Sequence, residues 1–174
     1  GVDGLLGQNI LGILDVEYDL ANGVVRIFKP QDCDRGMLAY WSSDGQGVSI
    51  MPIARTTPAE PHIYGRAKVN GMPIRVVFDT GANRSMLKLS SALRAGATLQ
   101  DEDASANDAM RGIGKRSTDS YILPFSSFEI GEETIKNTRL RVAKADLTGA
   151  DMLLGADFFL SHRVLVSQSQ HRLY

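Results

Sequence analysis

The chain has 174 residues, 43% of them hydrophobic, which is enough for one domain, or one domain and part of another, with a core of its own. Its formal net charge of −1 gives no electrostatic reason to expect nucleic acid or an anionic membrane surface as a partner. No apolar run is long enough to span a bilayer. The single cysteine, Cys33, cannot form an internal disulfide, so cysteine usage does not indicate a compartment.

Residues 1–33 contain a predicted hairpin and one copy of an internal repeat. Asn22-Gly23 stands between two β-prone runs, and this dipeptide is a strong signal for a tight turn. Five residues recur at a constant offset, which is 151 − 3 = 148 for the first of them. They are Asp3, Leu5, Leu6, Gly7 and Val16, which match Asp151, Leu153, Leu154, Gly155 and Val164. The match indicates a repeat; the alternative is an accidental match and an extra hairpin that packs on the domain.

Glycine, serine and proline punctuate residues 34–60, which is typical of a connecting segment. One short strand is expected inside it, at residues 48–51. Two further strands are predicted at residues 62–69 and 72–78, joined by a turn at Asn70-Gly71.

The second of these strands is an apolar, β-branched run that ends abruptly in Asp79-Thr80-Gly81-Ala82. A charged side chain at the buried end of a strand is costly unless it is hydrogen-bonded, paired or used in chemistry. Asp79 is therefore the first candidate for a functional residue.

The remaining chain alternates short strands with loops. Residues 100–108 are acidic and polar, which is typical of a surface loop, and residues 111–115 are a glycine-rich Arg-Gly-Ile-Gly-Lys string. A short helix or turn is expected at residues 90–95 and a short helix from about residue 157. Strands are expected at residues 85–89, 121–130, 134–142, 163–166 and 172–174.

Two motifs carry a resemblance to a known family. The first is Asp79-Thr80-Gly81-Ala82, and the second, Met152–Phe159, has two leucines, a glycine, a variable residue and an aspartate before an apolar helix. Their glycines are 155 − 81 = 74 residues apart, which leaves room for a flap. Together the motifs resemble the retropepsin branch of the aspartic proteases. The resemblance implies an all-β fold, a closed, barrel-like lobe with one or two short helices.

The resemblance also implies an aspartic endopeptidase, which hydrolyses peptide bonds with a water molecule activated by two Asp carboxylates. Asp79 would be the catalytic carboxylate of this lobe, within a loop completed by Thr80 and Gly81. No cofactor is implied, and no metal is expected, because the three histidines show no metal-ligand spacing. The positions that correspond to the peptide cleft and to a flap closing over the substrate are Ala82, Gly112, Ile113, Gly114 and Leu153.

The sequence contains one Asp-Thr-Gly tripeptide, so the second carboxylate must come from elsewhere. A symmetric homodimer would bring two copies of Asp79 together, as in retropepsins. Alternatively, the repeat places an equivalent aspartate at 79 − 148 = −69, in a preceding lobe. Residues 1–33 would then be the C-terminal remnant of that lobe, residues 34–60 a connector, and residues 61–174 the retropepsin-like lobe. The sequence does not decide between these two partners.

Two other interpretations stay open. The chain could be a non-catalytic module of the same fold that binds peptides, or that regulates and needs the preceding lobe. Residues 1–33 could instead supply strands that occupy the cleft or the interface until they are removed. In each case the expected partner is a peptide or protein. The chain also resembles bacterial proteins with tandem lobes, often exported, which favours the periplasm or cell envelope and leaves the compartment open.

Overall fold

The computed structural model describes residues 6–33, 36–43, 45–57, 59–99, 110–111, 117–118 and 120–174. The chain divides into two compact units, one made of residues 1–65 and 159–174 and the other of residues 66–158. The α-helices are short: α1 (Gln8–Leu11), α2 (Leu89–Arg94) and α3 (Ala156–Ser161). A 3-10 turn, η1, covers Leu20–Asn22. In the described part of the chain, no helix has the length and hydropathy that crossing a membrane requires.

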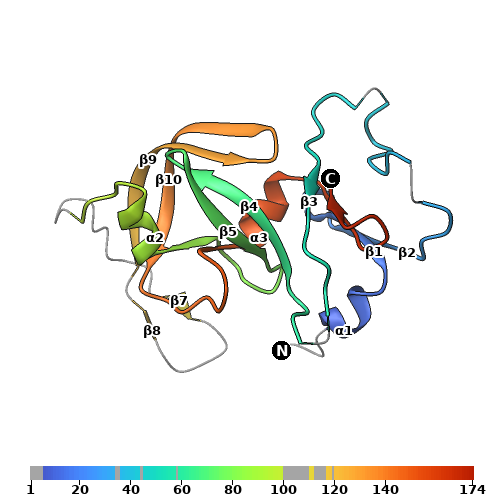
Figure 1. The fold of residues 1–174 in the computed structure, drawn as a ribbon, viewed down its shortest axis with the longest axis horizontal. Coiled ribbons are helices and arrows are strands. Elements are labelled where there is room, and N and C mark those ends of the chain that lie inside the picture. The colour runs from blue at the N-terminus through green and yellow to red at the C-terminus, as the bar shows by residue number, and fades with distance from the viewer. Residues whose placement is uncertain are drawn as a thin grey trace. The chain divides into compact units, whose positions relative to one another are not determined.

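Most of the regular structure is β, as predicted. The strands are β1 (Asp15–Asp19), β2 (Val24–Phe28), β3 (Met51–Pro52), β4 (Ile63–Val69), β5 (Met72–Phe78), β6 (Met86–Lys88), β7 (Met110–Arg111), β8 (Ser117–Thr118), β9 (Ser120–Ile130), β10 (Glu133–Ala143), β11 (Met152–Leu154), β12 (Val164–Ser167) and β13 (Arg172–Leu173). Six of them close a barrel in the order β10-β6-β11-β5-β4-β9. Figure 1 shows β4, β5, β9 and β10 of this barrel together with α2. The prediction of an all-β fold with a closed barrel and few short helices is confirmed.

β5 lies between β11 and β4 in this barrel, and its sequence explains its burial. Val76, Val77 and Phe78 are all buried, with exposed fractions of 0%, 8% and 6%, as in a strand covered on both faces. The turn before it, Asn70-Gly71, has positive φ at both residues, 50° and 76°. A turn of type I′ requires positive φ at both central residues, which is why Asn-Gly suits this hairpin.

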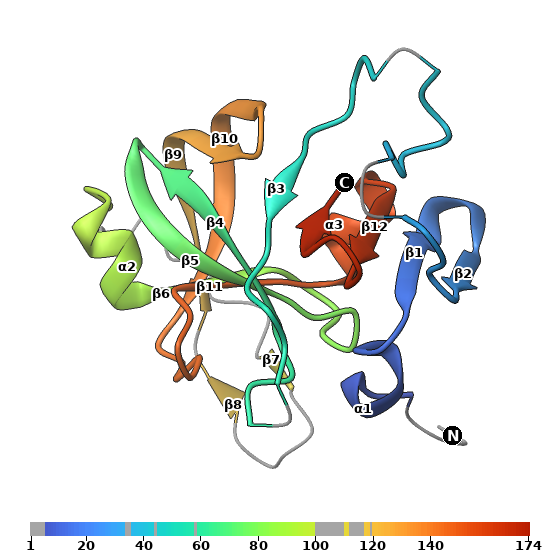
Figure 2. The same ribbon diagram turned by 45° about the vertical axis from the view of Figure 1, so that its right-hand side comes forward.

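The end of β5 is fixed by a strand that arrives from far along the chain. β11 lies parallel to β5, with Leu154 opposite Phe78, and antiparallel to β6, with Leu153 opposite Met86 (Figure 2). The two motifs found in the sequence therefore meet at neighbouring strand ends. α3 begins at Ala156, directly after this crossing.

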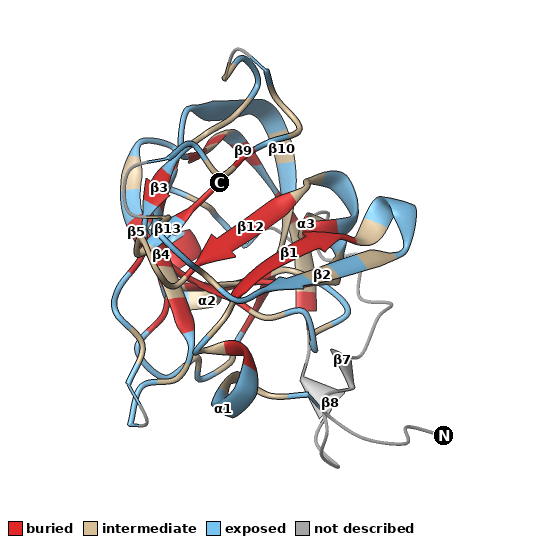
Figure 3. Ribbon diagram, turned by 90° about the vertical axis from the view of Figure 1, so that its right-hand side faces the viewer, coloured by how far each residue is buried: buried red, intermediate tan, exposed pale blue. Residues whose placement is uncertain are grey.

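The other unit contains a second sheet, with the strand order β2-β1-β12-β13-β3. β1 and β12 are the inner pair, and every residue of both strands is buried, as their red colour in Figure 3 shows. Tyr18 of β1 packs against Phe159 with ring centroids 5.3 Å apart. Burial also raises the pKa of the Tyr18 hydroxyl.

Most predicted elements lie within two residues of their observed bounds. The strand expected at residues 48–51 is instead Met51–Pro52, where it pairs with β13. The expected loop at residues 100–108 and the flap residues Gly112, Ile113 and Gly114 lie outside the described residues. The division into residues 1–33, 34–60 and 61–174 stays an interpretation of the repeat.

Candidate functional site

The loop that follows β5 holds the candidate catalytic carboxylate. Asp79 is half-buried, and its backbone N–H donates to the carbonyl oxygen of Leu154 at 2.9 Å, which extends the β5–β11 pairing by one residue. Its Oδ1 atom accepts the N–H of Gly81 at 2.9 Å, and its carbonyl oxygen accepts the N–H of Ala82 at 3.2 Å. An aspartate that bonds to the amide two residues ahead makes a local turn. The loop thus orients the side chain by backbone contacts.

Gly155 allows this loop to approach the end of β11. A Cβ atom at position 155 would lie 2.7 Å from the Ala82 carbonyl oxygen and 2.7 Å from the carbonyl carbon of Arg84. The same Ala82 oxygen accepts the N–H of Ala156 at 2.7 Å. A side chain cannot fit between the two backbones, so the glycine of the second motif is required by packing.

Ser85, at the C-terminal end of the loop that begins with Asp79, forms hydrogen bonds with Asp157 of the second motif. The Asp157 carboxylate accepts the Ser85 N–H, at 2.8 Å to Oδ1 and 2.9 Å to Oδ2, and the Ser85 hydroxyl, at 2.6 Å. Ser85 Oγ in turn accepts the N–H of the buried Gly155 at 3.0 Å. Asp157 therefore has a structural role in joining the two segments.

Asp151 forms a second polar cluster, at the start of β11. One oxygen accepts the Arg75 N–H at 2.9 Å, and the other accepts the Ser91 hydroxyl at 2.7 Å and the Arg94 guanidinium at 2.8 Å. Burial raises the pKa of the Asp151 carboxyl, but these hydrogen bonds and the charge of Arg94 outweigh burial, so the net pKa is lowered. The cluster joins β5, α2 and β11.

The described structure brings most of the candidate residues together. Asp79, Thr80, Gly81 and Ala82 share one loop, and Thr80 and Gly81 are exposed on it. Leu153 is half-buried on β11, where it pairs with Val77 of β5. Within the ranges the structure describes, no group of three or more His, Cys, Asp or Glu side chains is placed to hold a metal ion.

Sequence reasoning missed Ser85 and Asn70. Ser85 looked like an ordinary strand residue, and its four hydrogen bonds are to residues about seventy positions away. The Asn70 side chain accepts the N–H groups of Ser126 and Ser127 and donates to the carbonyl oxygen of Ala95. The Asn-Gly turn was visible in the sequence, but these contacts were not.

Comparisons with known proteins identify the family of the chain. The family model described as aspartyl protease matches residues 66–158. No curated protein matches the chain. Among solved structures, a retropepsin-like aspartic protease from Rickettsia conorii is 24% identical over 61% of this chain and 71% of its own, with a TM-score of 0.42. EIAV protease in complex with the inhibitor HBY-793 is 22% identical over 61% of this chain and 92% of its own, with a TM-score of 0.47. Basic 7S globulin from soybean is 14% identical over 91% of this chain and 49% of its own, with a TM-score of 0.49.

Proposed function

The chain belongs to the aspartyl protease family, and on this premise we propose that it is a catalytic lobe of an aspartic endopeptidase in which Asp79 is one of two catalytic carboxylates. The observation that carries the proposal is the Asp79 loop. Backbone contacts hold a half-buried carboxylate at the end of β5, and no basic side chain among the described residues forms an ion pair with it. A carboxylate that is oriented but not neutralised can serve as an acid or a base.

The mechanism needs two such carboxylates that share one proton. Two carboxyl groups about 3 Å apart do not both ionise, so the pair titrates as a unit. The ionised carboxylate takes a proton from water while the water oxygen bonds to the peptide carbonyl carbon. The protonated carboxyl donates to the carbonyl oxygen. The carboxyl group that took the water proton then gives it to the departing nitrogen as the carbon–nitrogen bond breaks, and the other carboxylate takes a proton back from the diol, which leaves an amine, a carboxylic acid and a dyad with one proton.

The neighbours of Asp79 have distinct roles in this proposal. Thr80 and Gly81 complete the loop, and the Gly81 N–H keeps Asp79 Oδ1 in place at 2.9 Å. Ala82 and Leu153 are small or apolar and would line side-chain pockets for the substrate. Gly112, Ile113 and Gly114 would belong to a flap whose backbone closes over the peptide. A peptide or an unfolded protein segment is the substrate class.

The test is peptide cleavage by the wild type and by Asp79→Asn. An unstructured peptide mixture is incubated at pH values from about 3 to 8, where a carboxyl pair gives a bell-shaped profile. The 174-residue chain and the product of its complete gene, whatever its length, are assayed side by side. We expect Asp79→Asn to lose at least about 100-fold in rate, the lower range for an acid–base group.

Asp32→Asn is the matched control, because Asp32 is exposed and its positive φ of 53° suits asparagine equally well. This variant should cleave like the wild type. Cleavage that survives Asp79→Asn would overturn the assignment of Asp79. Unfolding of both variants in urea should have the same midpoint, which separates lost chemistry from lost folding.

A further inference from the structure

The sequence repeat has a structural counterpart in the second sheet. α1 begins at Gln8 and α3 at Ala156, and 156 − 8 = 148. In the first hairpin Asp19 is opposite Val24, and in the last hairpin Ser167 is opposite Arg172. Both members of the second pair are 148 positions after those of the first, since 19 + 148 = 167 and 24 + 148 = 172. The β1–β2 and β12–β13 hairpins therefore have the same register.

The two hairpins also pair with each other in a symmetric way. Glu17 of β1 lies opposite Leu165 of β12, and 17 + 148 = 165, so this residue faces its own equivalent. Val16 lies opposite Val166, the equivalent of Tyr18, and Tyr18 lies opposite Val164, the equivalent of Val16. A contact in which residue i meets j and j meets i is the signature of a two-fold interface. β1 and β12 are thus paired as two subunits of a dimer would be.

This pairing leaves β12 no edge for a second copy of the chain. β12 has β1 on one side and β13 on the other, and β2 and β3 are the outer strands of the sheet. A homodimer built on β12 would have to displace the chain's own first hairpin. That exchange would break the β1–β12 pairing and expose apolar surface, because every residue of both strands is buried.

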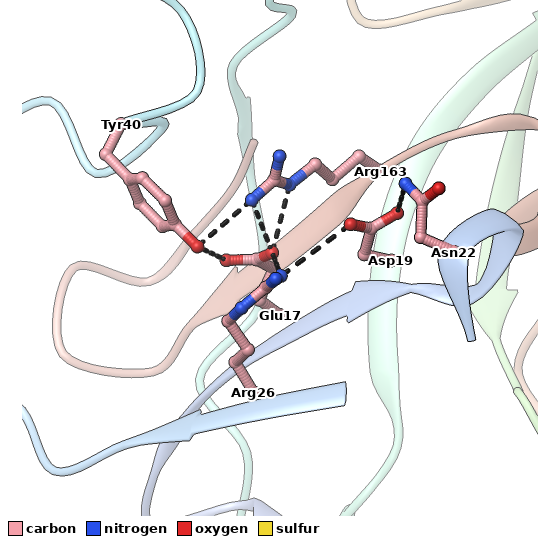
Figure 4. A network of polar contacts seen from close by, with 6 residues as sticks. All are labelled: Glu17, Asp19, Asn22, Arg26, Tyr40 and Arg163. Atoms are coloured by element: carbon pink, nitrogen blue, oxygen red, sulfur yellow. Dashed lines mark hydrogen bonds and ion pairs between the residues drawn. The ribbon is translucent and has the colours of Figure 1, made fainter. Parts of the chain in front are cut away.

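A buried charge favours the pairing of unlike repeats over the pairing of like ones, and Figure 4 shows the polar contacts around it. Glu17 is 0% exposed, and its carboxylate binds Arg26 at 2.6 Å and the Tyr40 hydroxyl at 2.7 Å. Across the strand pair, Arg163 donates to the same carboxylate at 2.9 Å from Nε and 2.8 Å from the guanidinium end. The Glu17 hydrogen bond also raises the pKa of Arg26.

The equivalent of Glu17 is apolar, so only the mixed pairing satisfies the charge. Pairing of two β1 strands in the same register would place Glu17 opposite a second Glu17, two buried carboxylates that repel each other. Pairing of two β12 strands would place Leu165 opposite Leu165 and would remove Arg163 from Glu17. Removing an arginine from a buried ion pair strongly destabilises the fold, because the carboxylate stays buried without its full compensation.

We propose that the catalytic partner of Asp79 is a preceding lobe of the same polypeptide, not a second copy of this chain, and that residues 1–33 are the end of that lobe. The Glu17 cluster, defined as Glu17, Arg26, Tyr40 and Arg163, selects this pairing. The inference rests on the proposed function, because only a dyad requires a second carboxylate. By the offset of the repeat, that lobe would carry the aspartate equivalent to Asp79 at position 79 − 148 = −69.

A disulfide trap tests the pairing on the 174-residue chain. Val16→Cys and Val166→Cys are introduced together with Cys33→Ser, because the first two residues face each other directly. Opposite residues of an antiparallel pair have Cα atoms about 4.5–5.5 Å apart, within the range of a disulfide. The two cysteines of one chain have an effective concentration of about 1 mM for each other. At a chain concentration of about 0.1 mM, the intrachain disulfide should therefore exceed the covalent dimer about tenfold.

The expected product is a disulfide-closed chain of 18.9 kDa that sediments as a monomer. Covalent dimer as the main product, or a reversible dimer of the wild type that cleaves peptide, would overturn the inference. Glu17→Gln in the trap background should raise the dimer fraction several-fold. Its matched control is Glu129→Gln, because Glu129 is ion-paired with Lys68 outside the cluster. An equal dimer fraction in the two variants would remove Glu17 as the selecting residue.

The activity assay separates this inference from the function on which it rests. We expect Asp79-dependent cleavage by the full-length gene product and none by the 174-residue chain. Cleavage by the 174-residue chain as a dimer would refute the inference and keep the function. Cleavage by neither form would refute the function, while the disulfide trap would still report which strands pair.

Discussion

Replacing Gly155 with alanine should damage the candidate site from a position that carries no functional group. The new Cβ atom would lie 2.7 Å from the Ala82 carbonyl oxygen, 2.7 Å from the Arg84 carbonyl carbon and 2.8 Å from the Arg84 oxygen. All three obstacles are backbone atoms, so no side chain can rotate away. Ordinary contacts between such atoms begin at about 3.5 Å, and the loop must therefore retreat by about 0.8 Å.

The cost has two parts. Overpacking a filled core position costs about 1–3 kcal/mol. The retreat also pulls Ala82 away from Ala156, whose hydrogen bond to it is 2.7 Å long, and a lost hydrogen bond adds about 1 kcal/mol. We expect Gly155→Ala to lower the free energy of unfolding by about 2–4 kcal/mol. Because Asp79 lies at the other end of the same loop, peptide cleavage should fall as well.

Urea unfolding monitored by fluorescence or circular dichroism measures the first effect, with the midpoint and slope fitted together. Gly36→Ala is the matched control, because a Cβ atom there meets nothing within 4 Å and the residue is exposed. That variant should stay within about 0.5 kcal/mol of the wild type. If Gly155→Ala were equally neutral, the close approach of the two motifs would not be a packing requirement, and the account of Gly155 would fail.

Two further variants test the polar clusters. The pKa of Asp151 is lowered in the folded state, so its contribution to stability is present above the unfolded pKa of about 4 and is lost as the pH falls through the folded pKa. Asp151→Asn should therefore be less stable than the wild type at neutral pH, with the difference shrinking in urea unfolding at about pH 3; a constant difference would contradict this. Ser85→Ala leaves the buried Gly155 N–H without its acceptor and takes a donor from Asp157, which should cost about 1–3 kcal/mol of stability. Ser90→Ala, at an exposed serine of α2, is its control and should change little.

The fold was predictable where local chemistry and burial pattern agree. Asn70-Gly71 has the residues that a tight turn needs, and the strands on either side have the bounds that their apolar pattern indicates. The parallel pairing of β5 with β11 was not predictable from local pattern, because its partners are 76 residues apart at Val76 and Met152. The two short motifs supplied that information, since their resemblance to one family placed them in one site.

The site was predictable as a set of positions and not as a set of contacts. Asp79 stood out because a carboxylate ends an apolar strand. Ser91 and Arg94 carried no such signal, because each becomes important only when the chain brings Asp151 within 2.7 Å and 2.8 Å of them. Glu17 is a similar case, since a charged residue in a predicted strand is expected to face solvent. Its burial depends on arginines and a tyrosine from three separate segments.

The acidic residues of the barrel unit differ in the kind of donor that each carboxylate accepts. Asp151 accepts a serine hydroxyl and an arginine guanidinium besides a backbone amide, and Asp157 accepts a serine hydroxyl besides two amides. The Asp79 carboxylate accepts the backbone amide of Gly81, in its own turn. Removing either of the first two charges is therefore expected to affect folding. Removing the charge of Asp79 takes away little that holds the lobe together, so Asp79→Asn is the variant whose loss of cleavage can be attributed to chemistry.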